Sequence, residues 1–115
     1  MHPNFFFIST YNIAGISKNY SKIPFLLESF KTIDIFAFQE THLRNDADAS
    51  LFTQIFSPQF RIYISNSETE THAGIIIGIN LQSMFRIDRK IFEIKGRALG
   101  IMLHVENKRF YIICI

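Results

Sequence analysis

The chain has 115 residues, of which 48% are hydrophobic and 19% are charged, and its formal net charge is +2. This length corresponds to at most one domain, and so large a supply of apolar side chains excludes an intrinsically disordered protein. The small positive charge permits contact with nucleic acid without arguing for it. A single cysteine, Cys114, excludes an internal disulfide, and its place in an apolar alternation indicates a small buried core residue.

Membrane insertion and secretion are not expected. No apolar stretch reaches the roughly 18 residues that a membrane-spanning helix needs. Residues 1–4 lack the basic segment that opens a signal peptide. We therefore expect a soluble intracellular protein, in the nucleus or the cytoplasm, with no membrane partner.

The first part of the chain predicts two buried strands separated by a helix. Residues 4–12 carry apolar and β-branched residues on both faces, which is typical of a strand buried on both sides. Ser21 can cap a helix whose first turn tolerates Pro24. The apolar stripe of this helix consists of Ile23, Leu26, Leu27 and Phe30. Residues 33–39, rich in Ile and Phe, predict the second strand.

A second helix and two further strands follow. Residues 45–48 open the helix, and Pro58 ends it. Its apolar residues pair at a spacing of four: Leu51, Phe52, Ile55 and Phe56. Residues 60–65 alternate as in a half-buried strand, and residues 65–71 form a polar loop. Residues 74–79 predict another strand, in which glycines indicate a bulge or a close approach of backbone.

The last third of the chain predicts three strands, at 84–94, 97–105 and 109–115, with a hairpin turn at 106–108. This order of elements predicts an α+β sheet protein instead of a regular α/β alternation. Residues 111–115 are strongly hydrophobic, and such a strand needs neighbours in a sheet. We interpret this pattern as a domain that has been cut or that another polypeptide completes.

The tetrapeptide 39–42, Gln-Glu-Thr-His, follows directly behind the apolar run at 33–38. A carboxylate at the mouth of a buried strand is costly unless something pairs with it. Mg²⁺ is one natural partner, because it takes oxygen ligands and binds through one or two carboxylates plus a substrate phosphate. The alternative is that Glu40 is a solvated residue just past the end of a strand.

Several segments together resemble a known superfamily. Residues 9–16, STYNIAGI, are similar to the first strand of the endonuclease/exonuclease/phosphatase superfamily, the DNase I-like fold. Residues 35–43, IFAFQETHL, resemble its second strand and metal-binding glutamate, and the His42-Leu43 continuation resembles the endonuclease domains of LINE-type retrotransposons. Weaker similarities lie at residues 73–77, 95–99 and 110–115.

The resemblance implies a truncated domain. The expected fold is an α+β, four-layer α/β sandwich of the DNase I-like kind, of which residues 1–115 supply about half as a partial endonuclease/exonuclease/phosphatase domain. The superfamily's Asp-x-Asn pair, its later acid and its terminal Ser-Asp-His element do not occur here. The missing C-terminal half of the domain is therefore an expected partner, and the fragment alone is expected to be inactive or nearly so.

By resemblance, Glu40 is the metal ligand for Mg²⁺, with Mn²⁺ as a substitute, and Asn12 orients the metal or the scissile phosphate. Gln39 can hydrogen-bond Asn12 or Glu40, His42 lies in a loop near the nucleic-acid surface, and Arg97 contacts phosphate. Each has a plainer alternative. Asn12 can satisfy a turn, Gln39 can face solvent, His42 can be structural, and Arg97 can be solvated or ion-paired.

A modest basic bias runs through the last third of the chain. Its five basic residues are Arg86, Arg89, Lys90, Lys95 and Arg97, and only Asp88 and Glu93 oppose them. The bias fits a surface along a DNA backbone. It fits equally well the ordinary polar face of edge strands, where Lys and Arg discourage aggregation.

We interpret these observations together as the N-terminal part of a Mg²⁺-dependent DNA endonuclease that derives from a retrotransposon. DNA is then the substrate of the intact domain. One alternative is a non-enzymatic interaction module whose open sheet edge binds a partner. Another is a phosphoesterase acting on lipid or inositol phosphates, because fold alone does not choose among the substrates of a superfamily.

Overall fold

The computed structural model describes residues 6–15, 22–43, 46–66 and 73–115. The described chain forms a four-stranded sheet in the order β1-β2-β4-β3 and a three-stranded sheet in the order β5-β6-β7. The first sheet contains β1 (Ile8–Asn12), β2 (Ile35–Gln39), β3 (Phe60–Ser65) and β4 (Ile75–Asn80). The second contains β5 (Arg86–Ile94), β6 (Ala98–Val105) and β7 (Lys108–Cys114). The helices are α1 (Lys22–Phe30) and α2 (Asp46–Phe56).

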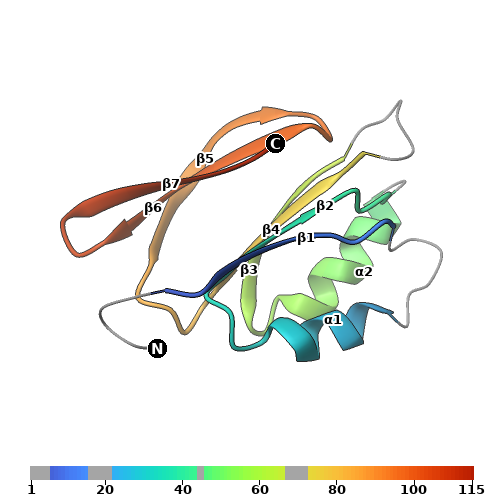
Figure 1. Ribbon diagram of the computed structural model, residues 1–115, viewed down its shortest axis with the longest axis horizontal. Coiled ribbons are helices and arrows are strands. Elements are labelled where there is room, and N and C mark those ends of the chain that lie inside the picture. Colours follow the sequence, from blue (N-terminus) through green and yellow to red (C-terminus); the bar gives the residue numbers. More distant parts are fainter. Residues whose placement is uncertain (1–5, 16–21, 44–45, 67–72) are drawn as a thin grey trace.

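The elements stack in layers (Figure 1). Both helices cover one face of the four-stranded sheet, and the three-stranded sheet covers its other face. Among the strands that the structure describes, β1 and β2 pair in parallel and the remaining pairs are antiparallel. The predicted α+β class is therefore confirmed. Residues 6–15, 22–43, 46–66 and 73–115 supply one helical layer and two sheet layers.

Strand periodicity divides the core in two. The side chains of β2 alternate, so that Phe36 and Phe38 face the helices while Ile35 and Ala37 face the second sheet. On the helical side Phe36 stacks on Phe38, with ring centroids 4.4 Å apart. The ring of Phe36 is fully buried and lies against Gly78 of β4, where an added Cβ would come within 2.1 Å of it. Gly78 thus makes room for an aromatic ring, in place of the bulge or close backbone approach that the sequence predicted for this strand.

Both predicted helices are present within two residues of their expected bounds. In α1, Ile23 and Leu26 are buried, and Pro24 lies in the first turn, where its missing N–H costs nothing. In α2, Phe52 and Phe56 are buried and Pro58 follows the last turn. The predicted capping residue of α1 at position 21, and the start of α2 at position 45, lie outside the described residues.

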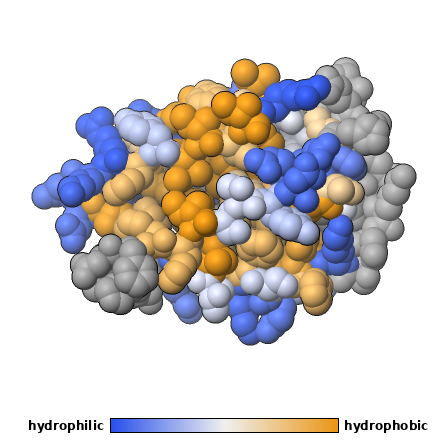
Figure 2. All heavy atoms as spheres, viewed as in Figure 1, coloured by the Kyte–Doolittle hydropathy of each residue, from blue (hydrophilic) through white to orange (hydrophobic). Residues whose placement is uncertain are grey.

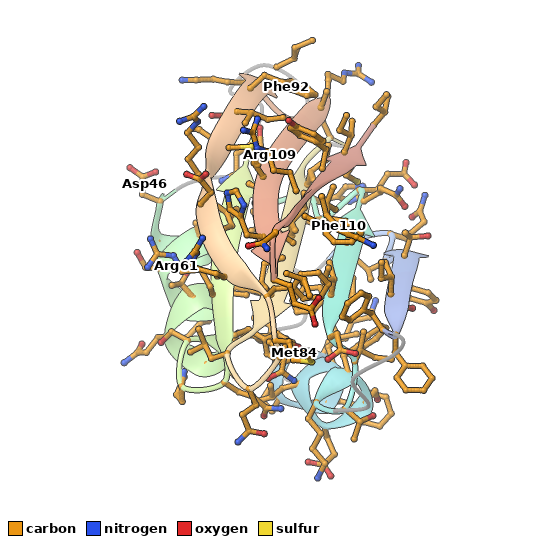
Figure 3. All side chains as sticks on the ribbon, turned by 90° about the vertical axis from the view of Figure 1, so that its left-hand side faces the viewer. Asp46, Arg61, Met84, Phe92, Arg109 and Phe110 are labelled. Atoms are coloured by element: carbon orange, nitrogen blue, oxygen red, sulfur yellow. The ribbon has the colours of Figure 1, made fainter. Side chains whose placement is uncertain are left out.

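The second sheet confirms the three predicted C-terminal strands. Strands β6 and β7 pair from Val105 with Lys108 to Leu99 with Cys114, so that residues 106 and 107 form the connecting turn. Cys114 is buried, as predicted. Figure 3 shows Phe92, Arg109 and Phe110 along this sheet. Phe110 packs into the core between the sheets, whereas Phe92 is 37% exposed.

One prediction about the first strand is wrong. Residues 4–12 were expected to form a strand buried on both faces, but β1 begins at Ile8, and four of its five residues are exposed. Strand β1 pairs only with β2 and is therefore an edge of the sheet within the described chain. The Ile and Tyr residues of β1 indicated a central strand, because residue type shows which side chains suit burial. Residue type does not show which neighbouring strands are present.

Among the described residues, no helix is both long enough and apolar enough to cross a membrane.

Candidate functional site

The parallel pairing of β1 with β2 brings two predicted site residues together. Asn12 is the register partner of Gln39, so the residue after β2, Glu40, lies beside the end of β1. The Asn12 side-chain amide donates a hydrogen bond from Nδ2 to Oε2 of Glu40. Asn12 Oδ1 accepts a hydrogen bond from the backbone N–H of Ala14 at 3.1 Å. Asn12 therefore holds one oxygen of the Glu40 carboxylate and shapes the turn that follows β1.

The backbone is unusual where both strands end. Ala14, Glu40 and His42 all have positive φ, at 48°, 52° and 55°. Such left-handed conformations are uncommon for residues other than glycine and cost about 1–2 kcal/mol each. The backbone N–H of Gly15 donates to the carbonyl of Glu40 at 2.8 Å, which ties the two turns to each other. Strain of this kind often occurs at functional sites, where the surrounding structure sustains it.

Glu40 opens onto a cleft of about 470 Å³. The cleft lies at the ends of strands from both sheets and is lined by Asn12, Gln39, Glu40, Ala73, Gly74, Ile75, Gly96, Arg97 and Ile115. Four of the predicted site residues line it. Asn12, Gln39 and Glu40 come from the ends of β1 and β2, and Arg97 comes from the turn between β5 and β6. The sequence-predicted set is thus brought to one place, with the exception of His42, which is not among the lining residues.

A series of backbone hydrogen bonds joins the Glu40 side of the cleft to the Arg97 side. Thr41 N–H donates to the carbonyl of Gly74 at 3.3 Å, and Gly74 N–H donates to the carbonyl of Gly96 at 3.1 Å. Gly96 has a φ of 75° at the third position of a turn closed by Arg97 N–H to the carbonyl of Ile94 at 2.8 Å. A positive φ at that position favours glycine. These contacts fix the distance across the cleft.

Ser65 anchors this series, and sequence reasoning missed it. Ser65 is fully buried at the end of β3, where its Oγ accepts a hydrogen bond from Gly96 N–H at 2.9 Å. Its hydroxyl also hydrogen-bonds the Glu93 side chain. The hydrogen bond from Lys90 is the largest cause that lowers the pKa of the Glu93 carboxyl, and the hydrogen bond from Ser65 is the next largest. In the sequence Ser65 is one more polar residue at the start of a loop, and no local pattern distinguishes it.

Gln39 and His42 have surroundings that the sequence did not reveal. Gln39 lines the cleft but also hydrogen-bonds Cys114, linking β2 to β7. Burial raises the pKa of the Cys114 thiol, and the Gln39 contact opposes that rise. The His42 ring lies against Gly15, where an added Cβ would come within 2.8 Å of Nδ1. His42 is half-buried between the turns that follow β1 and β2.

The basic bias along β5 is partly balanced by local contacts. Lys90 Nζ lies 2.7 Å from Glu93 Oε1, and His104 Nε2 lies 2.8 Å from Asp88 Oδ2. The hydrogen bond to His104 lowers the pKa of Asp88, and the charges of Arg89 and Arg86 act in the same direction. Strand β5 is also an edge of its sheet in the described chain. These contacts match the alternative of a polar edge strand, and Arg97 is the basic residue that lines the cleft.

The residues of the cleft suit a hard divalent cation. Glu40 offers an exposed carboxylate at the cleft wall, and within residues 6–15, 22–43, 46–66 and 73–115 its hydrogen-bond partner is the Asn12 amide. Mg²⁺ usually keeps several waters and binds through one or two carboxylates plus substrate phosphates, so one carboxylate in an open cleft is compatible with it. A hydrogen bond that orients a ligating carboxylate is the typical support for such a ligand.

Comparisons with known proteins place the fold. Neither a family model nor a curated protein matches the chain. Among solved structures, the AP endonuclease LMAP from Leishmania major matches with a TM-score of 0.67 at 20% identity, over 98% of this chain and 40% of that one. Truncated TDP2 from Caenorhabditis elegans matches with a TM-score of 0.62 at 14% identity, over 90% and 43% of the two chains.

A third solved structure extends the pattern. A functionally unknown conserved protein from Enterococcus faecalis V583 matches with a TM-score of 0.64 at 14% identity, over 92% of this chain and 50% of that one. The fold is therefore the predicted α+β, DNase I-like fold. The chain spans between 40% and 50% of the length of these neighbours.

Proposed function

We propose that this chain is the N-terminal half of a Mg²⁺-dependent phosphodiester hydrolase that cleaves DNA, and that it derives from a LINE-type retrotransposon. The observation that carries the proposal is the Glu40 carboxylate, held by Asn12 at the wall of a cleft that Arg97 also lines. The DNase I-like fold supports the reaction class. The His42-Leu43 continuation of the glutamate motif is the sequence feature that favours a retrotransposon origin.

The proposed roles follow from chemistry that hydrolysis of a phosphodiester requires. A bound Mg²⁺ supplies Lewis-acid neutralisation of charge on the phosphoryl oxygens. Glu40 holds the Mg²⁺ ion, and Mn²⁺ can replace Mg²⁺ because both cations take oxygen ligands. Asn12 fixes the orientation of the Glu40 carboxylate. Arg97, on the wall formed by the turn between β5 and β6, contributes a guanidinium for a phosphate oxygen. Gln39 supports the wall through Cys114.

The described residues that line the cleft include no clear group to activate water. The lining contains one carboxylate, Glu40, and no histidine among the residues that the structure describes. General-base catalysis needs a group within hydrogen-bond reach of the attacking water. We infer that the base belongs to the C-terminal half of the domain, in keeping with neighbours about twice as long, and that this chain alone is inactive or nearly so.

Two assays test the proposal separately. The first measures nicking of supercoiled plasmid in Mg²⁺ by the wild-type chain and by Glu40→Gln. We expect essentially no nicking, and nicking that disappears in Glu40→Gln would contradict the proposed inactivity.

The second assay measures thermal stabilisation by Mg²⁺. A site with a dissociation constant on the order of 1 mM gains about 1.4 kcal/mol at 10 mM Mg²⁺. Glu40→Gln is expected to lose this gain. Glu28→Gln is the matched control, because Glu28 is an exposed glutamate paired with Lys31 at 2.6 Å. Stabilisation that survives in Glu40→Gln would contradict the proposed ligand.

A further inference from the structure

Four strand edges are open in the described chain. They belong to β1 and β3 in the first sheet and to β5 and β7 in the second. Figure 2 shows an apolar band on the face where β1 and β7 lie in front, and the proposed function leaves that side to the C-terminal half of the domain. Strands β3 and β5 form the opposite edges of the two sheets.

The edges of β3 and β5 differ in their protection. Exposed edges normally carry charged residues, prolines or bulges that discourage pairing with another strand. Strand β5 has two irregularities in its register with β6 and five charged residues, namely Arg86, Asp88, Arg89, Lys90 and Glu93. Strand β3 has one charged residue, Arg61, no proline, and a regular register with β4 from Phe60 to Ser65. Among the residues that the structure describes, β3 therefore presents a regular edge with little protection.

A shallow groove of about 620 Å³ lies between β3 and α2. Two half-buried isoleucines that pack against the helical core, Ile62 and Ile64, form its side along β3. Its side along α2 consists of small and polar residues, namely Asp46, Ala49, Ser50, Thr53 and Gln54. None of these residues lines the cleft at Glu40. Because the side chains of a strand alternate between its faces, every second side chain of a strand added to β3 would enter the groove.

Opposite charges lie at the two ends of this edge. Asp46, exposed at the start of α2, lines the groove together with Ile64 near the end of β3, and it has no ion-pair partner in the described part of the chain. Arg61, exposed near the start of β3, lies over the Tyr63 ring at 5.7 Å and therefore on the other face of the sheet. Figure 3 shows Asp46 and Arg61 on the same side of the molecule. The edge is therefore negative towards the end of β3 and positive towards its start.

We propose that the β3 edge binds an extended peptide segment of another protein, which pairs with β3 as an additional antiparallel strand. The antiparallel direction continues the pairing of β3 with β4, and antiparallel pairs are slightly the more stable kind. In this direction the segment begins near Asp46 and ends near Arg61. The recognised pattern is a basic residue, two apolar residues at alternate positions opposite Ile64 and Ile62, and an acidic residue opposite Arg61. Backbone hydrogen bonds give such complexes their affinity, and the side-chain sites give them specificity.

The groove and the charges favour this partner over a second copy of the chain. In a pair of β3 strands, Ile62 and Ile64 of each copy would have to enter the groove of the other copy. Both side chains already pack against the helical core of their own copy. A separate segment brings apolar side chains that can enter the groove, and its charges can complement Asp46 and Arg61 at the same time.

Fluorescence polarisation with a labelled peptide of sequence Ser-Lys-Thr-Val-Thr-Val-Glu-Ser, blocked at both ends, tests the proposal. The wild-type chain is expected to bind this peptide with a dissociation constant below about 1 mM. Asp46→Lys is expected to weaken binding about fivefold, the upper range for an exposed ion pair. A charge-swapped peptide, with Glu in place of Lys, should bind Asp46→Lys as the original peptide binds the wild type. Glu28→Lys is the matched control, because it changes the net charge equally at an exposed position of α1, and it should bind like the wild type.

Hydrogen exchange locates the bound peptide. In an antiparallel ladder about half of the β3 amides point away from β4, and these should exchange more slowly when the peptide is bound. Protection confined to β1 or β7 would place the peptide at another edge and overturn the proposal. Far-UV circular dichroism verifies that each variant is folded.

Three other results would also overturn the proposal. Absence of saturable binding up to about 1 mM peptide would show that the β3 edge does not accept the segment. Equal weakening by Glu28→Lys, or no recovery with the charge-swapped peptide, would show that Asp46 does not recognise the basic residue. A dimer that light scattering detects and that excludes the peptide would show that a second copy occupies the edge. Binding should be unchanged by Mg²⁺ and by Glu40→Gln, so failure of this proposal is distinguishable from failure of the proposed function.

Discussion

Replacing Ser65 with alanine tests the anchoring of the cleft from a residue outside its lining. The substitution leaves the buried Gly96 N–H without its acceptor at 2.9 Å. An unsatisfied buried donor costs about 1–3 kcal/mol. The lost hydrogen bond to Glu93 adds less, because the Glu93 side chain is 21% exposed and water can replace the hydroxyl. We therefore expect Ser65→Ala to lower the free energy of unfolding by about 2–3 kcal/mol.

This loss is measurable by thermal unfolding. An unfolding entropy of about 2.1 cal/mol/K per residue gives about 0.24 kcal/mol/K for a chain of 115 residues. The expected decrease in Tm is then about 10 °C. Ser29→Ala is the control, because the exposed Ser29 hydroxyl donates to the Phe25 carbonyl within α1 and its loss should change stability by less than about 0.5 kcal/mol.

The pH dependence provides a second check on the same contact. The pKa of Glu93 is lowered from its ordinary value of 4.5 in the folded state, so its contribution to stability is present above that value and disappears as the pH falls through the folded pKa. The effect of Ser65→Ala should accordingly be larger at pH 7 than at pH 3. A loss below 0.5 kcal/mol at pH 7, or the same loss at both pH values, would refute the reasoning.

Three further substitutions have expected outcomes by the same unfolding assay. Gly78→Ala should cost about 1–3 kcal/mol, because its Cβ would meet the fully buried ring of Phe36. Gly100→Ala should cost less, because the Phe92 ring it meets is 37% exposed and can turn aside, and equal costs would contradict this account. Ala14→Gly should raise stability by about 0.5 kcal/mol, because relief of a φ of 48° outweighs the larger unfolded-state entropy of glycine, and a decrease would show that the turn is not strained.

Much of the fold could be predicted from local patterns. The helical stripe ending at Phe30 and the strand at residues 60–65 each depend on residues close in sequence, and both elements are present. The expected alternation of burial in that strand is incomplete, because Ser65, predicted on its polar face, is buried. The edge position of β1 could not be predicted, because Ile8 and Tyr11 suit a central strand, and whether a further strand pairs with β1 depends on distant chain. Hydrophobic pattern specifies which faces tend to be buried, while topology decides whether they are.

The residues of the site likewise include some that the sequence indicated and some that it did not. The family resemblance predicted that Asn12 and Glu40 belong to one site, and the structure brings them together because β1 and β2 are parallel and end at the same edge of a sheet. Ser65 could not be predicted, since its hydrogen bond reaches Gly96, 31 residues away, and no spacing rule connects them. The contact of Gln39 with Cys114 was missed for the same reason, because it joins two sheets.

The most direct test of the central claim is a titration of the ¹⁵N-labelled chain with Mn²⁺, followed by paramagnetic broadening of backbone amide signals. Binding at the proposed ligand predicts selective broadening of residues around the cleft, including Glu40, Gly74 and Arg97, and loss of that broadening in Glu40→Gln. Broadening centred on Asp46 and Asp48 at the start of α2, unchanged in Glu40→Gln, would contradict it.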